Sequence, residues 1–223
     1  MKGLVKWILT GLVACLPGLA SAQPTQGEPG SPPVAKVVRF GAAYEVSWMS
    51  TTWTVTQSER SETLSTDVLS PSPAFHTLRL WVGRRKAWSP NVAGEVRVSL
   101  GVGHAFERRQ SLVGTLGTPY RLESSFNLLD LELGNRLLFL RQIVFVELGF
   151  CWQRLVASAR LRDGADDHPM GRSEDYLGGH AGLGAELEVV QGLHVGLSLG
   201  AAGYIKGFGP FPTRKRISLF VSW

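Results

Sequence analysis

Hydrophobic and polar residues alternate with a period of two along most of the chain after residue 36. In the segment KVVRFGAAYEVSW, residues 36–48, apolar side chains occupy the even positions from Val38 to Trp48. The odd positions hold Arg39, Glu45 and small residues. Successive side chains of a β-strand point to opposite faces of the sheet. This segment is therefore predicted to be a strand whose two faces meet different environments.

The same alternation returns in seven further segments, which predicts eight strands in all. These segments are 75–83, 92–106, 120–135, 143–153, 176–189, 194–204 and 213–223. Long connections alternate with short ones between them, and the long ones are 49–74, 107–119, 154–175 and 205–212. Such a rhythm is typical of an up-and-down meander. Residues 36–223 are therefore predicted to form an all-β domain, an eight-stranded antiparallel up-and-down barrel.

One predicted strand, residues 120–135, changes phase along its length. Its apolar residues occupy even positions as far as Leu128 and odd positions from Leu129 onward. One extra residue inserted in a strand produces such a shift, so a β-bulge is predicted near Leu128.

Alternation alone is compatible with two kinds of barrel. A lipocalin-like soluble barrel has its apolar face inside, whereas a membrane barrel turns that face to lipid. Here the polar face carries many Gly, Ala and Ser residues, which suit the narrow interior of an eight-stranded barrel. It also carries charges predicted to pair in the lumen, as charges removed from water require. These residues are Arg39, Glu45, Arg79, Glu95, Arg97, Asp130, Glu132, Glu147, Glu186, Glu188, Arg214 and Arg216.

The apolar face also favours the membrane arrangement. Its aromatic residues gather toward the strand ends, and Trp and Tyr prefer the two interfaces of a bilayer. Strands of about ten residues match the ~9–11 residues that a tilted strand needs to cross. The sequence therefore predicts a transmembrane barrel.

The first residues of the chain have the pattern of a secretory signal peptide. A basic start is followed by an apolar run of about ten residues and by a small-residue cleavage site that ends at Ala22. Residues 1–22 are predicted to be removed between Ala22 and Gln23, with lipoprotein processing at Cys15 as the alternative. Residues 23–35 are rich in Pro, Gly and polar residues and are predicted to be a disordered tether.

Charge and cysteine content narrow the class of protein further. Loss of Lys2 and Lys6 with the signal peptide lowers the net charge from +5 to +3, and both signs are interspersed. This charge pattern does not indicate a nucleic-acid-binding protein. Cys151 is the remaining cysteine, so no disulfide within the chain is predicted. No apolar run approaches the ~18 residues of a transmembrane helix.

The last predicted strand, KRISLFVSW, finishes on an aromatic residue. Ile217, Leu219, Val221 and Trp223 share one of its faces. With the export signal and eight strands, the chain from about residue 36 resembles the small eight-stranded outer-membrane barrels of Gram-negative bacteria, the OmpA/OmpX type. The resemblance implies that these four residues are an assembly signal read by the barrel-insertion machinery. It also implies a monomer surrounded by outer-membrane lipid and lipopolysaccharide.

Some barrels of this size modify lipid A, so catalytic residues were sought. Such deacylases carry a His and a Ser two residues apart, and no H-x-S occurs here, which removes the simplest activated nucleophile. His104 and Ser124 on neighbouring strands are a weaker alternative. His180 and His194 share the inward phase on paired strands and could meet in the lumen, but no third metal ligand is evident, so two polar lumen side chains are the favoured interpretation. No catalytic residue, metal or cofactor is predicted.

The sequence thus predicts a non-enzymatic integral outer-membrane protein. Its role is predicted to be structural, in envelope integrity or in surface interaction through the long extracellular loops. The interior of such a barrel is too full for a general solute channel. A lipid A-modifying enzyme and a soluble periplasmic lipocalin-like binder of an apolar ligand are the alternatives.

Overall fold

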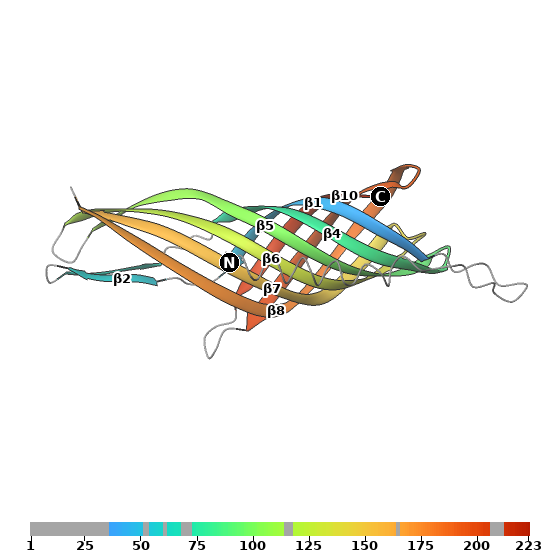
Figure 1. Ribbon diagram of the computed structural model, residues 1–223, viewed down its shortest axis with the longest axis horizontal. Helices are drawn as coiled ribbons and strands as arrows, with labels where there is room; N and C mark the ends of the chain where they lie inside the picture. The colour runs from blue at the N-terminus through green and yellow to red at the C-terminus, as the bar shows by residue number, and fades with distance from the viewer. Residues whose placement is uncertain are drawn as a thin grey trace, which may run out of the picture.

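Eight strands close into one antiparallel barrel in the computed structural model (Figure 1). The structure describes residues 36–50, 54–59, 62–67, 73–113, 118–163, 166–205 and 212–223. The barrel strands are β1 (Lys36–Ser50), β4 (Ala74–Ser89), β5 (Val92–Val113), β6 (Pro119–Phe139), β7 (Val144–Asp163), β8 (Asp166–Val190), β9 (Leu193–Ile205) and β10 (Thr213–Ser222). Two short strands, β2 (Thr54–Glu59) and β3 (Glu62–Asp67), form a separate two-stranded sheet. The predicted eight-stranded up-and-down barrel is confirmed. The predicted signal peptide and tether lie outside the described residues.

The first and last barrel strands pair with each other and close the ring. Ten residue pairs join β1 to β10, from Gly41 and Ser222 to Ser50 and Thr213. Beyond them, the backbone N–H of Phe40 donates to the carbonyl of Trp223 and the N–H of Trp223 to the carbonyl of Phe40, each over 3.0 Å. Closure removes both sheet edges, whose unpaired backbone groups hydrocarbon cannot satisfy. No helix in the described residues is long and apolar enough to cross a membrane.

The two faces of the ring are reversed relative to a soluble barrel. Large apolar side chains point outward, among them Leu78, which is 70% exposed, and Phe150, which is 72% exposed. Charged side chains point inward, among them Arg214 and Asp130, which are 2% and 0% exposed. Exposed leucine and phenylalanine on every side fit a hydrocarbon surrounding, while buried charges need partners inside. The barrel therefore has a lipid-facing exterior, as the sequence predicted.

The β-bulge predicted near Leu128 is wrong. On β6 the inward phase runs unbroken from Tyr120 to Leu138. The register shift lies instead on β5, between Ala105 and Arg108. The apparent change of phase has another cause: the lumen is apolar toward the long-loop end, so inward residues such as Leu122 and Leu128 are hydrophobic there.

Four strands are much longer than a bilayer crossing requires. β5, β6, β7 and β8 have 22, 21, 20 and 25 residues, against 15, 16, 13 and 10 in β1, β4, β9 and β10. The predicted long connections 107–119 and 154–175 are therefore largely strand. Their hairpins continue to the pairs Val113–Pro119 and Asp163–Asp166. The four strands run past the rest of the barrel at one end as a four-stranded extension (Figure 1).

The reversed faces give opposite expectations for two arginine substitutions. Leu80→Arg places a charge in the middle of the outward apolar stretch of β4 and should destabilise the barrel in lipid by about 2–4 kcal/mol. Val113→Arg, on the outward face of the extension, should change stability by less than about 0.5 kcal/mol. Urea unfolding of both variants in lipid vesicles measures the difference. Equal stability of Leu80→Arg and the unsubstituted protein would contradict the lipid-facing exterior.

Candidate functional site: the luminal charge network

A central cluster of three arginines and three carboxylates fills the middle of the barrel. Its members are Arg79, Arg214, Arg216, Glu45, Asp130 and Glu132. Asp130 accepts from Arg79 Nη2 over 2.7 Å and from Arg214 Nη1 over 2.5 Å. Arg79 Nη1 lies 3.0 Å from Glu132 Oε2. Arg214 also binds Glu45, and Arg216 binds Glu132. The charges of the cluster balance, which is the condition for burying them away from water.

Small residues make this cluster possible. Gly101 is the β5 residue between Arg79 of β4 and Asp130 of β6 in the register. A Cβ atom at Gly101 would lie 3.5 Å from the Arg79 guanidinium carbon. Gly200 is the β9 partner of Arg216, and a Cβ atom there would lie 2.9 Å from Arg216 Nε. The inward glycines thus leave the volume that the long arginine side chains occupy.

A second cluster lies toward the short turns. Arg39 Nη1 and Arg85 Nη2 both donate to Glu186 Oε1, over 2.8 and 2.5 Å. Arg85 Nε donates to Glu95 Oε2 over 2.8 Å. Arg39 also donates to Ser222 Oγ over 2.6 Å. These contacts tie β1, β4, β5, β8 and β10 together inside the ring.

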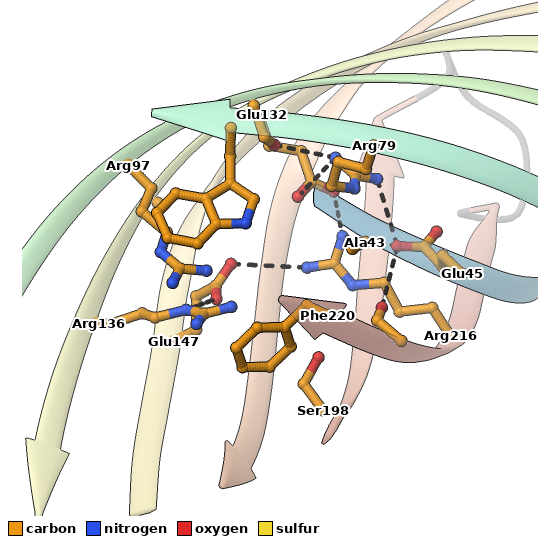
Figure 2. Close-up of a pocket in the computed structure, with 14 residues that line it drawn as sticks. Ala43, Glu45, Arg79, Arg97, Glu132, Arg136, Glu147, Ser198, Arg216 and Phe220 are labelled. Carbon is orange, nitrogen blue, oxygen red and sulfur yellow. Dashed lines mark hydrogen bonds and ion pairs between the residues drawn. The ribbon is translucent and has the colours of Figure 1, made fainter. Parts of the chain in front are cut away.

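Between the two clusters, arginines alternate with aromatic rings. The guanidinium carbon of Arg97 lies 3.5 Å from the centre of the Trp81 ring, and that of Arg136 lies 3.9 Å from the centre of Phe145. Phe220 lies near both, at 5.7 and 5.0 Å. Arginine over an aromatic face is favourable, more so when the pair is desolvated. Figure 2 shows Arg97, Arg136 and Phe220 converging on one cavity.

The cavity that these side chains enclose is small. Its volume is about 40 Å³, and its walls include Glu132, Arg136, Glu147 and Arg216. Such a volume holds about one or two water molecules and leaves no room for a substrate. The arrangement therefore packs and pairs the interior instead of binding a ligand there.

Eleven of the twelve charged residues predicted for the lumen are buried inside the barrel. They are Arg39, Glu45, Arg79, Glu95, Arg97, Asp130, Glu132, Glu147, Glu186, Arg214 and Arg216. The structure does not bring Glu188 into the network. Glu188 is exposed, and its carboxylate accepts from the backbone N–H of Gly192 over 2.7 Å in the β8–β9 turn. The register shifts just after Glu188, so the inward alternation ends before the turn.

Two members of the network were missed in the sequence. Arg85 and Arg136 are 8% and 7% exposed, and Arg136 binds Glu147. Both lie beyond the predicted strands 75–83 and 120–135, because the apolar residues around them stop alternating. The inward phase was the available signal. Arg85 continues the odd-numbered inward positions that include Arg79, and Arg136 continues the even-numbered inward positions that include Glu132.

The histidines do not form the constellations considered from the sequence. His180 Nε2 lies 3.2 Å from Glu147 Oε1, whereas His194 Nδ1 lies 3.7 Å from Glu186 Oε1. They belong to different parts of the lumen and do not meet, which agrees with the interpretation as two separate polar side chains. His104 points outward and Ser124 is buried on the opposite face, so this pair does not meet either.

One group of side chains has the composition of a metal site. Ligand atoms of Glu132, Glu147 and His180 lie within 4.8 Å of one another. However, Arg216 already binds Glu132 and Arg136 already binds Glu147. A divalent cation would have to displace these buried arginines and leave them unpaired, which is costly. The group is better described as part of the charge network.

Comparison with known proteins gave structural matches alone. No protein-family model matches the chain, and no curated protein matches it either. Several of the solved structures that resemble this chain are small eight-stranded outer-membrane barrels, and three of them follow. Ail, the attachment invasion locus protein of Yersinia pestis, is 11% identical, with 84% of this chain and 98% of that chain covered and a TM-score of 0.39.

Neisserial surface protein A is 10% identical, with 84% and 97% covered and a TM-score of 0.37. The N-terminal barrel domain of Pseudomonas aeruginosa OprF is 8% identical, with 82% and 97% covered and a TM-score of 0.33. Because all three TM-scores lie below 0.5, the fold assignment rests on the strand ring and its two faces.

Removal of one central arginine should show how much the barrel depends on the network. Arg214→Ala leaves Glu45 and Asp130 without a major partner and should destabilise the protein by about 3–5 kcal/mol. Lys215→Ala, one residue later and facing outward, is the matched control and should cost less than about 1 kcal/mol. Urea unfolding in lipid vesicles compares them. Similar losses in the two variants would contradict a structural role for the network.

Proposed function

We propose that this protein is a non-enzymatic integral barrel of the Gram-negative outer membrane. It presents the four-stranded extension at the cell surface and has a role in envelope integrity or surface interaction. The observation that carries the proposal is the closed ring with apolar side chains outside and paired charges inside. A soluble lipocalin-like binder would have the opposite arrangement and would expose residues such as Leu78 and Phe150 to water.

Three outward polar pairs, on six of the eight barrel strands, support the membrane position. We call them the polar girdle, which consists of Tyr44–His76, His104–Asn127 and Arg154–Asp175. The Tyr44 hydroxyl lies 2.5 Å from His76 Nδ1, and His104 Nδ1 lies 2.9 Å from Asn127 Oδ1. Arg154 Nη2 donates to Asp175 Oδ2 over 2.8 Å. Each pair joins adjacent strands toward the long-loop end of the outward apolar stretch, and outward apolar residues such as Trp48 and Phe106 lie next to this level as interfacial aromatic side chains do.

The height of the apolar band below the girdle fits a bilayer. On β7 the outward residues are apolar from Val144 to Trp152 and become charged at Arg154. Ten residues of a strand tilted by ~40° span about 25 Å, the height of the apolar band of outer-membrane barrels. The girdle thus corresponds to the interface on the long-loop side, and the extension lies beyond it.

The packed lumen supports a role other than solute transport. Charge clusters, arginine–aromatic contacts and an apolar cluster follow one another along the axis, and the cavity among the central described residues has a volume of about 40 Å³. Charged pairs held by several contacts do not open without breaking buried bonds. We therefore propose a barrel that conducts no general solutes.

Outer-membrane location and the absence of a soluble form are directly testable. In a Gram-negative host, the protein should fractionate with the outer membrane and migrate differently in gels with and without boiling, as folded membrane barrels do. Reconstituted into planar bilayers, it should give no steady conductance. Recovery as a soluble periplasmic protein would overturn the membrane proposal, and deacylation or acylation of lipid A by the purified barrel would overturn the non-enzymatic one.

The outward face of β10 provides the proposed recognition surface for the barrel-insertion machinery. Ile217, Leu219, Val221 and Trp223 are all exposed on that face. Trp223→Phe should insert normally, because it keeps an aromatic side chain at the interface. Trp223→Asp should slow or prevent insertion, measured as the heat-shifted band over time after induction. Normal surface levels of Trp223→Asp would contradict the assembly role.

A further inference from the structure

An open groove crosses the outward face of the extension. Its volume is about 610 Å³, within the range of small-molecule sites. Its floor is a row of small residues, because Ser125 of β6, Ser158 of β7 and Gly171 of β8 are partners in the register. Because these three adjacent strands carry only small side chains there, the groove runs across the sheet.

The walls of the groove carry charged groups. Glu123 of β6 and Arg160 of β7 are partners in the row above the floor. At the β5 side, the register shift between Ala105 and Arg108 places two residues opposite one, and Glu107 lines the groove there. The bulge therefore adds a carboxylate to one end of the groove.

Arginines dominate the rim. Arg109, Arg121 and Arg162 lie 3.6, 3.4 and 3.3 Å from Glu123 and are each largely exposed. The single carboxylate of Glu123 is thus shared by three cations. Arg160, in the wall, has no carboxylate within ion-pair distance among the described residues, although Glu123 faces it across the strands. Its guanidinium is available to an external anion.

The groove lies directly above the polar girdle. Its floor residue Ser125 is two positions along β6 from Asn127, a member of the girdle, and both face outward. A ligand in the groove would therefore occupy the layer just outside the hydrocarbon. In the leaflet on this side of the membrane, that layer consists of lipid headgroups.

We propose that the groove binds the phosphorylated sugar headgroup of a glycolipid in the surrounding leaflet. Arg160 binds a phosphate, for which a planar guanidinium with several donors is suited. The hydroxyls of Ser125 and Ser158 and the carboxylates of Glu107 and Glu123 bind sugar hydroxyls. The inference rests on the proposed membrane position, because that position brings headgroups to the groove.

Retention of a glycolipid by the reconstituted barrel tests the proposal. The protein is placed in phosphatidylcholine nanodiscs that contain traces of a bisphosphorylated, acylated disaccharide, and bound glycolipid is measured by native mass spectrometry. Arg160→Gln should weaken binding at least tenfold, and Ser158→Leu should abolish it by filling the floor. Arg84→Gln, an outward arginine on β4 near the short turns, removes the same charge and should bind as the unsubstituted protein does.

Three results would overturn the assignment. Equal binding by Arg160→Gln and the unsubstituted protein would exclude the groove as the binding site, provided that both proteins show the heat-shifted band of the folded barrel. Equal binding of the dephosphorylated glycolipid would show that the groove does not recognise the phosphate. Full competition by the water-soluble, deacylated sugar phosphate at the same affinity would identify a soluble ligand instead of a membrane lipid. Failure of the unsubstituted protein to enter nanodiscs would instead overturn the proposed membrane function.

Discussion

Pairing of charges in a lumen too narrow for bulk water is the constraint on which this barrel depends. A carboxylate such as Asp130, fully buried, is stable only because Arg79 and Arg214 donate to it. The partners come from strands far apart in the sequence, so the pairs form only when the ring closes. The same pairs then hold β1, β4, β6 and β10 at fixed positions around the axis. Gly200 follows from this constraint, because a side chain there would displace Arg216.

The charge network also explains why the exterior can be apolar. Because the inward charges pair with one another, the outward face can stay apolar until the strands leave the hydrocarbon. The polar girdle marks that level, and above it both faces of the extension meet polar surroundings or neighbouring protein. In the proposed function, such a barrel conducts no general solutes and holds the extension beyond the membrane. The groove proposed for a glycolipid headgroup lies at the boundary between these two parts.

Much of the fold was predictable because hydrocarbon imposes a strict period of two. Val38 to Trp48 on one face and Arg39 to Ser47 on the other identified the first strand and its orientation. The prediction failed where that environment ends. Residues 107–113 are strand with polar residues on both faces, so the alternation fades there. In the strand residues 155–163 the alternation reverses, because the inward residues such as Leu155 and Leu161 are apolar and outward residues such as Arg160 are charged. The lumen is not polar along its whole length. The apolar inward residues near Leu128 therefore gave the apparent change of phase that predicted a bulge.

The charged site was predictable residue by residue, but its contacts were not. The inward phase identified Glu45 and Arg214, yet which arginine binds which carboxylate depends on the shear of the closed ring. Arg85 and Arg136 were missed because apolar alternation was used to end the strands, although the inward phase continues through both. Glu188 was included because its phase is correct, but it lies at a turn, where phase no longer determines direction.

The central claim is that the outward residues of the ring face hydrocarbon. Collisional accessibility of spin labels tests it most directly, with labels at positions 80, 197 and 121 of a Cys151→Ser barrel in lipid vesicles. We expect the labels at 80 and 197 to collide with oxygen, which dissolves in lipid, and to be shielded from a water-soluble nickel complex. The label at 121, on the extension, should show the reverse. Nickel access at 80 and 197 equal to that at 121 would contradict the account.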